Sequence, residues 1–376
     1  MDFGFASGAT VFAGSAVVQS GGVASATTVL SGGTEIVSAH GSDFGAQISG
    51  GIELDFGLTS GATIYAGSQV VESAGTAGNT TVSSGGTLDL LKGAVVSGVV
   101  VASGGTFVAS GSATVSGTLS LNGTTSVSSG AVLQTASNGT VVVGGTVANS
   151  GTLFASGAGS LVDIASGAVV NGGGVAEVGN GIVDIQANGD NQNVSFLSSG
   201  SGGLELNDTA GNPSAFGGRV VGFGKNTAQF IDLTAVASAG GVSLSYTSNT
   251  SSSGVLTVSS GGTVVASINF SGSYTTSSFH ITSGASGTVE IFDPPVEPQK
   301  DAESATGSKT PPASPDPFIT GSSSSNDDYA GMHWPDAPDT VAGALTLGEN
   351  SLGARDFAVA DFATPHDIGG SANDIA

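Results

Sequence analysis

Acidic side chains are the residues of this sequence best suited to chemistry. Cleavage of a polysaccharide on an extended β protein would need acids gathered on one face, with a divalent cation and a catalytic arginine or lysine beside them. Only three basic residues precede the C-terminal tail: Lys92, Arg219 and Lys225. Acids such as Asp163, Asp184 and Asp190 stand isolated in the sequence. We therefore predict no catalytic residues and no enzymatic activity, with a polysaccharide lyase or hydrolase as the alternative.

Calcium binding is the second chemistry to consider. Repeats of the form G-G-x-G-x-D-x-U-x bind calcium between successive turns, because each turn presents carboxylates and carbonyls to the next. The segment "GNGIVDIQANGD" at 179–190 comes nearest and places Asp184 in phase. It has Asn180 and Ile182 where the motif needs glycine, and it does not recur. We predict a polar corner here, no metal site and no cofactor.

Histidine and cysteine provide no further metal site. The chain has no cysteine, and its four histidines lie far apart with no second ligand at metal spacing. We expect these histidines at the surface: His40, His280, His333 and His366. The tripeptide Asp-Phe-Gly begins at Asp2, Asp43 and Asp55 without the surrounding motifs of a kinase. Its repetition predicts a corner of a repeated unit.

The composition excludes several classes of partner. The formal net charge is −23, from 29 acidic and 6 basic residues, which argues against binding nucleic acid or an anionic membrane surface. Charged residues make up 9% of the chain and glycine accounts for 63 residues, so a long, thin, repetitive core is expected. No apolar run approaches the roughly 18 residues that a membrane helix needs.

Internal repeats set the architecture. Residues 2–34 and 55–87 are identical at 22 of 33 positions, a period of 53 that divides into three units of about 18. Periods near 20 are typical of stacked β coils. Short β-prone runs such as "ATVF", "TTVL" and "TEIV" alternate with Ser-Gly or Gly-Gly, which break helices and permit tight corners. The chain is therefore predicted to be all-β.

The substitutions between the two repeats predict which side chains point inward. Val11 and Ile64 stay aliphatic and are expected in the narrow interior. Phe12 and Tyr65 keep an aromatic ring, which predicts a half-exposed edge. The pairs that exchange freely are expected to face water: Ala16/Gln69 and Gln19/Glu72.

Composition changes along the chain predict four segments. Residues 1–185 form β-helix repeats of about 18–20 residues per coil, and residues 186–293 form a β-rich end module. Residues 294–340 are a Pro/Ser-rich linker, and residues 341–376 are an acidic tail. We expect the linker and the tail to be disordered.

The repeats resemble the passenger repeats of AIDA-type autotransporter adhesins over residues 2–178. The likeness is carried by "SGGVASATTVLSGGTEIV" at 20–37 and "SAGTAGNTTVSSGGTLDL" at 73–90, each a strand, a Gly-Gly turn and a strand. The resemblance implies a right-handed parallel β-helix (solenoid) exported to the bacterial cell surface. It also implies a role in adhesion, aggregation or biofilm formation.

The following segment resembles a module near the C-termini of large type I-secreted proteins of alphaproteobacteria. The likeness is carried by four elements: "GFG" to "IDL" at 222–233, "LTV" at 256–258, the "Y…SSF" run at 274–279 and "DPP" at 293–295. Such proteins carry an uncleaved C-terminal secretion signal, which we assign to about the last 60 residues. The residues after Met1 match a repeat and lack the pattern of a secretory signal, which fits that route.

Together these patterns predict a non-enzymatic, adhesin-like β-solenoid that is secreted or displayed on the bacterial surface. Its mechanism would be multivalent weak contact along a rigid rod. The expected partners are cell-surface glycans or neighbouring cells, together with the secretion machinery. A passive spacer within a larger secreted assembly is a further alternative, and no individual binding residue is assigned.

Overall fold

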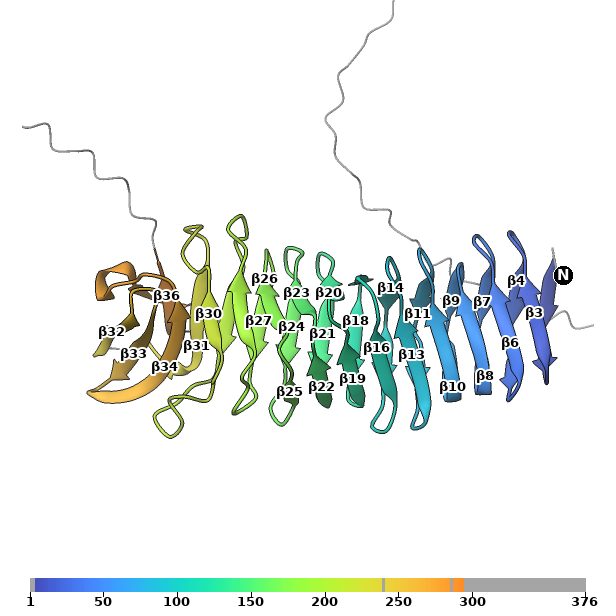
Figure 1. Cartoon of the computed structure of the whole chain (residues 1–376), viewed down its shortest axis with the longest axis horizontal. Coiled ribbons are helices and arrows are strands. Elements are labelled where there is room, and N and C mark those ends of the chain that lie inside the picture. Colours follow the sequence, from blue (N-terminus) through green and yellow to red (C-terminus); the bar gives the residue numbers. More distant parts are fainter. Residues whose placement is uncertain (1–3, 239–240, 285–286, 294–376) are drawn as a thin grey trace, which may run out of the picture. The chain divides into compact units, whose positions relative to one another are not determined.

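The computed structural model describes residues 4–238, 241–284 and 287–293. Regular structure in these residues is β throughout, apart from one 3₁₀ turn at Thr276–Ser278. The strands pair in parallel along most of this part of the chain, so each coil lies beside the next (Figure 1). The predicted all-β parallel β-helix is confirmed. Among the residues described, no helix is long and apolar enough to span a membrane.

The coils contribute strands to three faces, which we number in chain order; the coils after β25 contribute to the first two only. Face one contains β1 (Phe5–Ser7), β4 (Val23–Ser25), β7 (Ser42–Phe44), β9 (Leu58–Ser60), β11 (Thr76–Gly78), β14 (Val95–Ser97), β17 (Ala113–Val115), β20 (Val132–Thr135), β23 (Thr152–Ala155), β26 (Val175–Val178), β28 (Asn193–Phe196) and β30 (Arg219–Val221). Face two contains β2 (Thr10–Val11), β5 (Thr28–Leu30), β8 (Gln47–Asp55), β10 (Thr63–Val71), β12 (Thr81–Val82), β15 (Val99–Val101), β18 (Thr118–Leu121), β21 (Thr140–Val143), β24 (Leu161–Ile164), β27 (Ile182–Ile185), β29 (Gly203–Leu206) and β31 (Phe230–Ala237). Face three contains β3 (Gly14–Val18), β6 (Gly33–Val37), the second halves of β8 and β10, β13 (Gly86–Leu90), β16 (Thr106–Ala109), β19 (Thr124–Val127), β22 (Thr146–Asn149) and β25 (Val169–Asn171).

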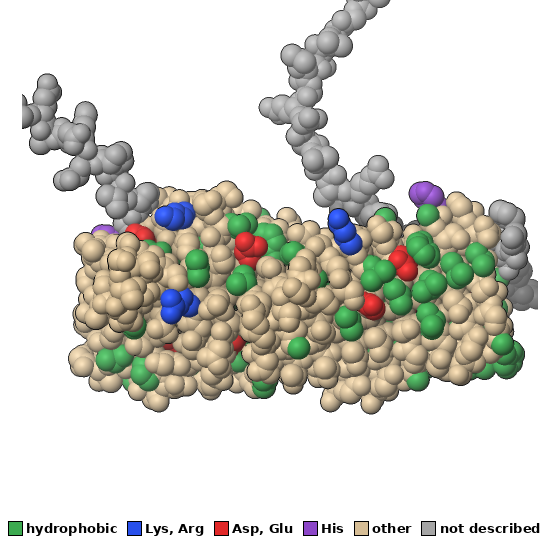
Figure 2. Space-filling model, viewed as in Figure 1, with side chains coloured by type: hydrophobic (Ala, Val, Ile, Leu, Met, Phe, Trp, Pro, Cys, Tyr) green, Lys and Arg blue, Asp and Glu red, His purple; other side chains and the backbone are tan. Residues whose placement is uncertain are grey.

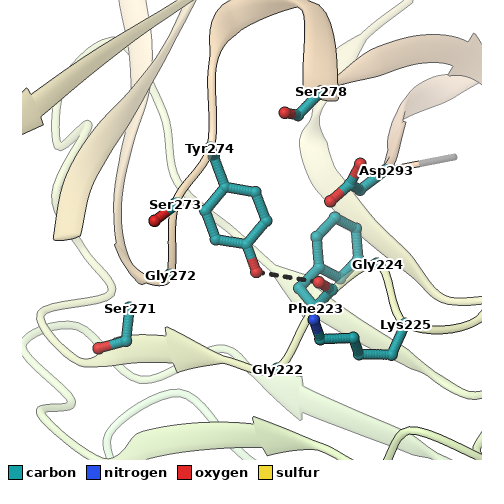
Figure 3. Close-up of a pocket in the computed structure, with 10 residues that line it drawn as sticks. All are labelled: Gly222, Phe223, Gly224, Lys225, Ser271, Gly272, Ser273, Tyr274, Ser278 and Asp293. Carbon is teal, nitrogen blue, oxygen red and sulfur yellow. Dashed lines mark hydrogen bonds between the residues drawn. The ribbon is translucent and has the colours of Figure 1, made fainter. Parts of the chain in front are cut away.

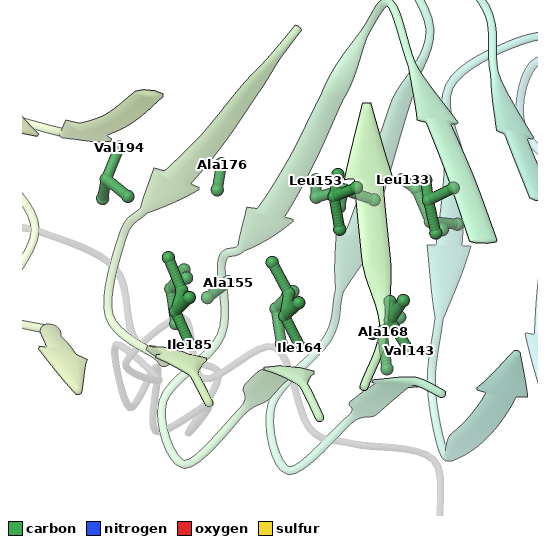
Figure 4. Close-up of a cluster of buried hydrophobic side chains, with 14 of the residues drawn as sticks. Leu133, Val143, Leu153, Ala155, Ile164, Ala168, Ala176, Ile185 and Val194 are labelled. Atoms are coloured by element: carbon green, nitrogen blue, oxygen red, sulfur yellow. The ribbon is translucent and has the colours of Figure 1, made fainter. Parts of the chain in front are cut away.

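The interior consists of side chains stacked in files, one per coil. The longest file runs along face two and is aliphatic at every coil: Val11, Val29, Ile48, Ile64, Val82, Val101, Leu121, Val143, Ile164, Ile185, Leu206 and Leu233. Figure 4 shows Val143, Ile164 and Ile185 of this file, with Leu153 and Val194 of face one across the interior. Because successive strands lie about 4.8 Å apart, each side chain contacts its counterparts above and below. The expected inward positions of Val11 and Ile64 are confirmed.

One exchangeable pair points the other way from our prediction. Gln69 is fully buried, and it occupies the interior file of face three between Glu53 and Leu88. Its Nε2 donates to Thr59 Oγ1 at 2.8 Å, and its Oε1 accepts from Thr80 Oγ1 at 3.3 Å. These buried partners replace water, so a polar side chain is tolerated in the interior. Our prediction that Gln69 faces water was therefore wrong.

The two glycines of a Gly-Gly corner are required for different structural reasons. Gly85 has φ +91°, in the left-handed region that other residues rarely adopt. Gly86 follows, and a Cβ there would lie 2.5 Å from the backbone oxygen of Ile64 in the neighbouring coil. The first glycine therefore permits the turn, and the second permits the coils to approach.

The C-terminal end of the described residues switches to antiparallel pairing. The parallel files continue past residue 185, where we had placed the end of the repeats, to β30 and β31. Five strands complete this end: β32 (Val242–Thr250), β33 (Ser253–Ser260), β34 (Thr263–Ser271), β35 (His280–Ser283) and β36 (Thr288–Phe292). They pair antiparallel among themselves, and β34 joins β30 while β36 joins β31. Such an end covers the open core and strand edge of the last coil.

Two of the four predicted segments cannot be compared with the structure. The linker at 294–340 and the acidic tail at 341–376 lie outside the described residues, as do His333 and His366. The division at residues 185 and 186 stays a prediction about domains, although parallel pairing crosses it without interruption.

We expect substitution of Gly86 by alanine to destabilise the protein by about 1–3 kcal/mol, because the added methyl group must displace the backbone of the adjoining coil. Gly173→Ala is the matched control, because no heavy atom lies within 4 Å of a Cβ there. Its effect should stay within about 0.5 kcal/mol. Urea unfolding followed by circular dichroism would measure both, and equal midpoints for the two variants would contradict the close-approach explanation.

Candidate functional site

Five acids form a continuous row on the outer side of face two. Strand register pairs each one with the next: Asp163, Asp184, Glu205, Asp232 and Glu290. These residues lie far apart in the sequence, but neighbouring strands bring paired positions to about 5 Å. Our prediction that Asp163 and Asp184 are isolated was therefore wrong. The in-register stack gathers acids that occur only once per coil.

Burial and mutual repulsion act together on this row of acids. Burial raises the pKa of Asp163, and the adjacent Asp184 carboxylate raises it further. Burial also raises the pKa of Glu205, followed by the charges of Asp184, Asp232 and Asp163. Asp184 keeps one partner, since its Oδ2 accepts from Gln186 Nε2 at 2.7 Å. The row therefore concentrates negative potential along the later coils.

The basic residues do not complete a polysaccharide-cleaving site with these acids. Arg219 lies on β30 of face one, where its guanidinium donates to Ser271 Oγ at 3.3 Å. Lys92 is exposed between β13 and β14. Lys225 lines a hollow at the C-terminal end. Among the described residues, acids therefore cluster on one face, but no lysine or arginine lies beside them.

That C-terminal hollow gathers the motif residues that the sequence analysis singled out. It encloses about 470 Å³ and is lined by Gly222 to Lys225, Ser271 to Tyr274, Ser278 and Asp293. Figure 3 shows the Tyr274 ring pointing at the Phe223 carbonyl, with Asp293 on the opposite side. The hydroxyl of Tyr274 donates to that carbonyl oxygen at 2.9 Å. Segments about 50 and 70 residues apart in the sequence therefore meet at one place.

Packing at this hollow accounts for the Gly-Phe-Gly motif at 222–224 and for Asp293. Gly224 has φ +80°, and a Cβ there would lie 2.2 Å from Asp293 Oδ2. Below the hollow, Phe223 packs edge-on against Phe196 with ring centroids 5.1 Å apart. Burial raises the pKa of Asp293 to about 6, while Lys225 and His280 act to lower it. The arrangement fastens the last coils to the antiparallel end.

A second group of acids lies inside the early coils, where the sequence analysis had placed none. Glu35 on β6, Asp43 on β7 and Glu53 on β8 are 1%, 1% and 0% exposed. One carboxylate oxygen from each lies within 4.8 Å of the others. Asp55, one of the expected corner residues, ends β8 beside them and accepts from Gly57 N at 3.1 Å. Asp43, a second of them, points into the core from the middle of its strand, and Asp2 lies outside the described residues.

Burial raises the pKa of every acid in this interior group. For Glu35 it raises the pKa to about 7, with a further increase from Asp43 and an opposing hydrogen bond from Thr27. Asp43 has a pKa of about 6 and Asp55 of about 7, also through burial. The pKa of Glu53 lies well above its ordinary value because of burial and the charges of Asp43, Glu35 and Asp55. A narrow apolar interior therefore disfavours the carboxylate form of all four.

Exposed apolar side chains gather on the early coils. Seven of the larger ones precede residue 66: Phe5, Phe12, Phe44, Ile52, Phe56, Leu58 and Tyr65. Tyr65 is 51% exposed, as expected for a half-exposed edge, whereas Phe12 is more exposed, at 68%. Figure 2 shows hydrophobic side chains grouped over the N-terminal coils, at the right of the view, while the opposite half is mostly polar. The two ends of the solenoid thus present different surfaces.

The remaining predicted residues have local structural roles. The segment at 179–190 contains strand β27, so the polar corner that we expected is limited to its end, where the buried Asp190 Oδ1 accepts from Gln192 N at 2.8 Å. His40 and His280 are exposed and lie on separate elements. His40 has φ +64°, at the turn between β6 and β7.

Register explains why the interior acids were missed. Glu35 and Glu53 lie 18 residues apart, one coil, so their stacking was readable from the period. Glu35 lies two residues before the inward Val37, and it stands 53 residues, one full repeat, before the inward Leu88. Asp43 gave no such signal, because its approach to Glu53 depends on the path of the coil from face one to face three.

No protein-family model matches the chain, and no curated protein sequence matches it. Among solved structures, the chain is similar to a crystal structure of a TibC-catalysed, hyper-glycosylated TibA fragment. The sequences are 24% identical over 62% of this chain and 98% of that fragment, with a TM-score of 0.33. A similarity at this level carries no conclusion about function, and the parallel coils are established by the strand pairing itself.

We expect the thermal stability of the protein to fall as pH rises from about 4 to 6, partly because of Asp208. Asp208 is fully buried, and burial raises its pKa to about 6 although its Oδ1 accepts from Phe216 N. An unfolded aspartate titrates near pH 4. Between these values the folded chain holds a proton that the unfolded chain has released, so stability declines across the window and then levels off.

The variant Asp208→Asn isolates this contribution, because it keeps an acceptor for Phe216 N and cannot ionise. Melting temperatures measured in EDTA from pH 4 to 8 should fall less steeply for the variant than for the unmodified protein. Asp208→Ala should instead lower the melting temperature at every pH, since the Phe216 amide then lacks its acceptor. Identical slopes for the asparagine variant and the unmodified protein would show that Asp208 does not titrate in this range.

Proposed function

We propose that this protein is a non-enzymatic, adhesin-like β-solenoid that acts outside the bacterial cell through multivalent contact. The observation that supports this most directly is an outward file of hydroxyl groups along face three: Ser15, Thr34, Ser68, Thr87, Thr106, Thr124 and Thr146. Ile52 interrupts the file once, between Thr34 and Ser68. The file otherwise offers the same chemical group once per coil.

Regular spacing favours binding to a polymer rather than to a small ligand. Successive hydroxyls are about 4.8 Å apart because the strands that carry them are hydrogen-bonded neighbours. A glycan chain also presents hydroxyl groups at regular intervals, so several weak hydrogen bonds can form at once. Each bond contributes little alone, but linked contacts raise the overall affinity by large factors.

The exposed aromatic residues of the early coils extend this surface. Phe12 and Tyr65 occupy matching positions in the two repeats, and Phe56 and Leu58 line a shallow hollow beside His40. Contiguous exposed apolar groups commonly mark interaction sites. We infer that this end makes apolar contacts with a neighbouring cell surface, while the hydroxyl file makes polar ones.

Export from the cell is part of this proposal. The resemblance to type I-secreted modules and the acidic composition of the last residues support a secretion signal within about the last 60 residues. Full-length protein should leave the native bacterium intact, whereas a chain lacking residues 317–376 should remain in the cytoplasm. Immunoblots of medium, cell surface and cytoplasm would measure this, and retention of both forms would contradict the proposed route.

The hydroxyl file can be tested without changing the shape of the side chains. The test variant carries four substitutions: Thr87→Val, Thr106→Val, Thr124→Val and Thr146→Val. We expect its binding to glycan arrays and to whole cells to fall by at least about tenfold, since linked contacts are lost together. A face-two variant serves as the control and should bind normally: Thr10→Val, Thr28→Val, Thr63→Val and Thr81→Val.

Two other outcomes would identify the alternative functions. A passive spacer would bind no glycan or cell in either form. A polysaccharide lyase or hydrolase would release reducing ends from a polysaccharide substrate, and Asp184→Asn in the outer acidic row would reduce that release. Either result would overturn the adhesin-like assignment.

A further inference from the structure

We propose that Glu35, Asp43 and Glu53 bind one calcium ion inside the early coils of the solenoid. The three residues come from three strands of two successive coils, and they converge on one point of the interior. Glu35 and Glu53 are stacked in register on face three, and Asp43 faces them from face one. This site is independent of the adhesive function proposed above.

Five of the six carboxylate oxygens of Glu35, Asp43 and Glu53 have no hydrogen-bond partner among the described residues. Both oxygens of Glu53, both oxygens of Asp43 and Oε2 of Glu35 are buried and accept no hydrogen bond. Glu53 is 0% exposed, so water does not reach it as it would a surface carboxylate. A buried acceptor without a donor costs about 1–3 kcal/mol, and more when it is charged. Each of the three acids has at least one such oxygen, and one ligand oxygen from each lies within 4.8 Å of the others, which indicates a missing positive partner.

Thr27 hydrogen-bonds to Glu35, but the other nearby donors are engaged elsewhere. Thr59 Oγ1 donates to Asp55 Oδ2 at 2.8 Å, and Gly57 N donates to Asp55 Oδ1. Gln69 Nε2 donates to Thr59 and Thr80 donates to Gln69, so this chain of hydrogen bonds ends at Asp55. These donors therefore satisfy the carboxylate of Asp55, the fourth acid, and provide no hydrogen bond to Glu35, Asp43 or Glu53. The described residues around these three acids are apolar or uncharged and include no lysine or arginine. They are Ala6, Ala16, Ala24, Thr27 and Gln69.

The geometry and chemistry favour calcium over other common cations. Calcium is bound by oxygen ligands at 2.3–2.6 Å, so two ligands on opposite sides of it lie about 4.6–5.2 Å apart. The ligand atoms here lie within 4.8 Å of one another. Magnesium requires a near-ideal octahedron of ligands at about 2.0–2.1 Å, whereas calcium accepts irregular arrangements such as three carboxylates fixed on different strands. Zinc prefers histidine and cysteine, and neither contributes to this group.

A hollow beside the group provides a path for the ion. It encloses about 250 Å³ next to the first coils and is bounded by Thr27 and Glu35 on one side. Small side chains occupy the positions that precede the acids in their files: Ala16 precedes Glu35, and Ala24 precedes Asp43. Larger residues at these two positions would close the hollow. The small residues thus leave space next to the interior carboxylates where later coils have tightly packed aliphatic groups.

Calcium binding to the full-length protein tests this proposal directly. After treatment with EDTA and exchange into 150 mM salt, isothermal titration with CaCl₂ should show one ion per chain, and calcium should raise the melting temperature. MgCl₂ should bind at least about tenfold more weakly. The variant Glu53→Gln, which keeps the side-chain shape, should weaken calcium binding by at least about tenfold and abolish the calcium-dependent rise in melting temperature.

Control variants separate this site from the other acids of a strongly acidic chain. Glu205→Gln removes a carboxylate from the outer row on face two and should leave the calcium titration unchanged. Asp43→Asn provides a second test if Glu53→Gln fails to fold. Absence of stoichiometric calcium binding by the unmodified protein would overturn the proposal, as would undiminished binding by both interior variants. Equal binding of magnesium would overturn the choice of calcium, and loss of binding only in Glu205→Gln would place the ion on the outer row.

Discussion

The structure depends on one constraint, which is the in-register stacking of parallel coils. Each strand forms its hydrogen bonds with the equivalent strand of the next coil, so every position inherits the orientation of the position before it. The file from Val11 to Leu233 remains aliphatic because each member packs between two others of its own kind. This repeated contact replaces the large central core of a globular domain, which a chain with so many small residues cannot build.

The same constraint concentrates whatever chemistry a coil contains. An acid placed outward once per coil becomes a row, as with Asp163, Asp184 and Glu205 on face two. A threonine placed outward once per coil becomes a hydroxyl file on face three. Because the coils differ along the chain, exposed apolar side chains gather on the early coils (Figure 2), whereas the outer acidic row lies on the later coils. A single fold thereby presents several distinct surfaces to its surroundings.

The face-three file of the interior changes from polar in the early coils to mainly apolar in the later ones, and burying the polar side chains is unfavourable unless they have partners. Later coils fill the face-three file with Leu88 and Phe107, whereas the early coils place Glu35, Glu53 and Gln69 at the same register. Gln69 is compatible with burial because the hydroxyls of Thr59 and Thr80 bind its amide. Glu53 has no such partner. The contrast between these two adjacent residues is the reason for inferring a bound cation rather than a simple polar core.

The sequence by itself determined the fold, because the fold is local and periodic. Repeats of about 18 residues, Gly-Gly corners and alternating side chains together specify a parallel β-helix, and Val11 and Ile64 could be assigned inward from two repeats alone. Tertiary structure decided the rest. Three features depend on the exact register of each coil and on its path around the corners. They are the inward orientation of Gln69, the pairing of acids that lie 20 or more residues apart, and the approach of Asp43 to Glu53. A shift of one residue in a strand would reverse every one of these orientations, and composition and period do not specify the register that closely.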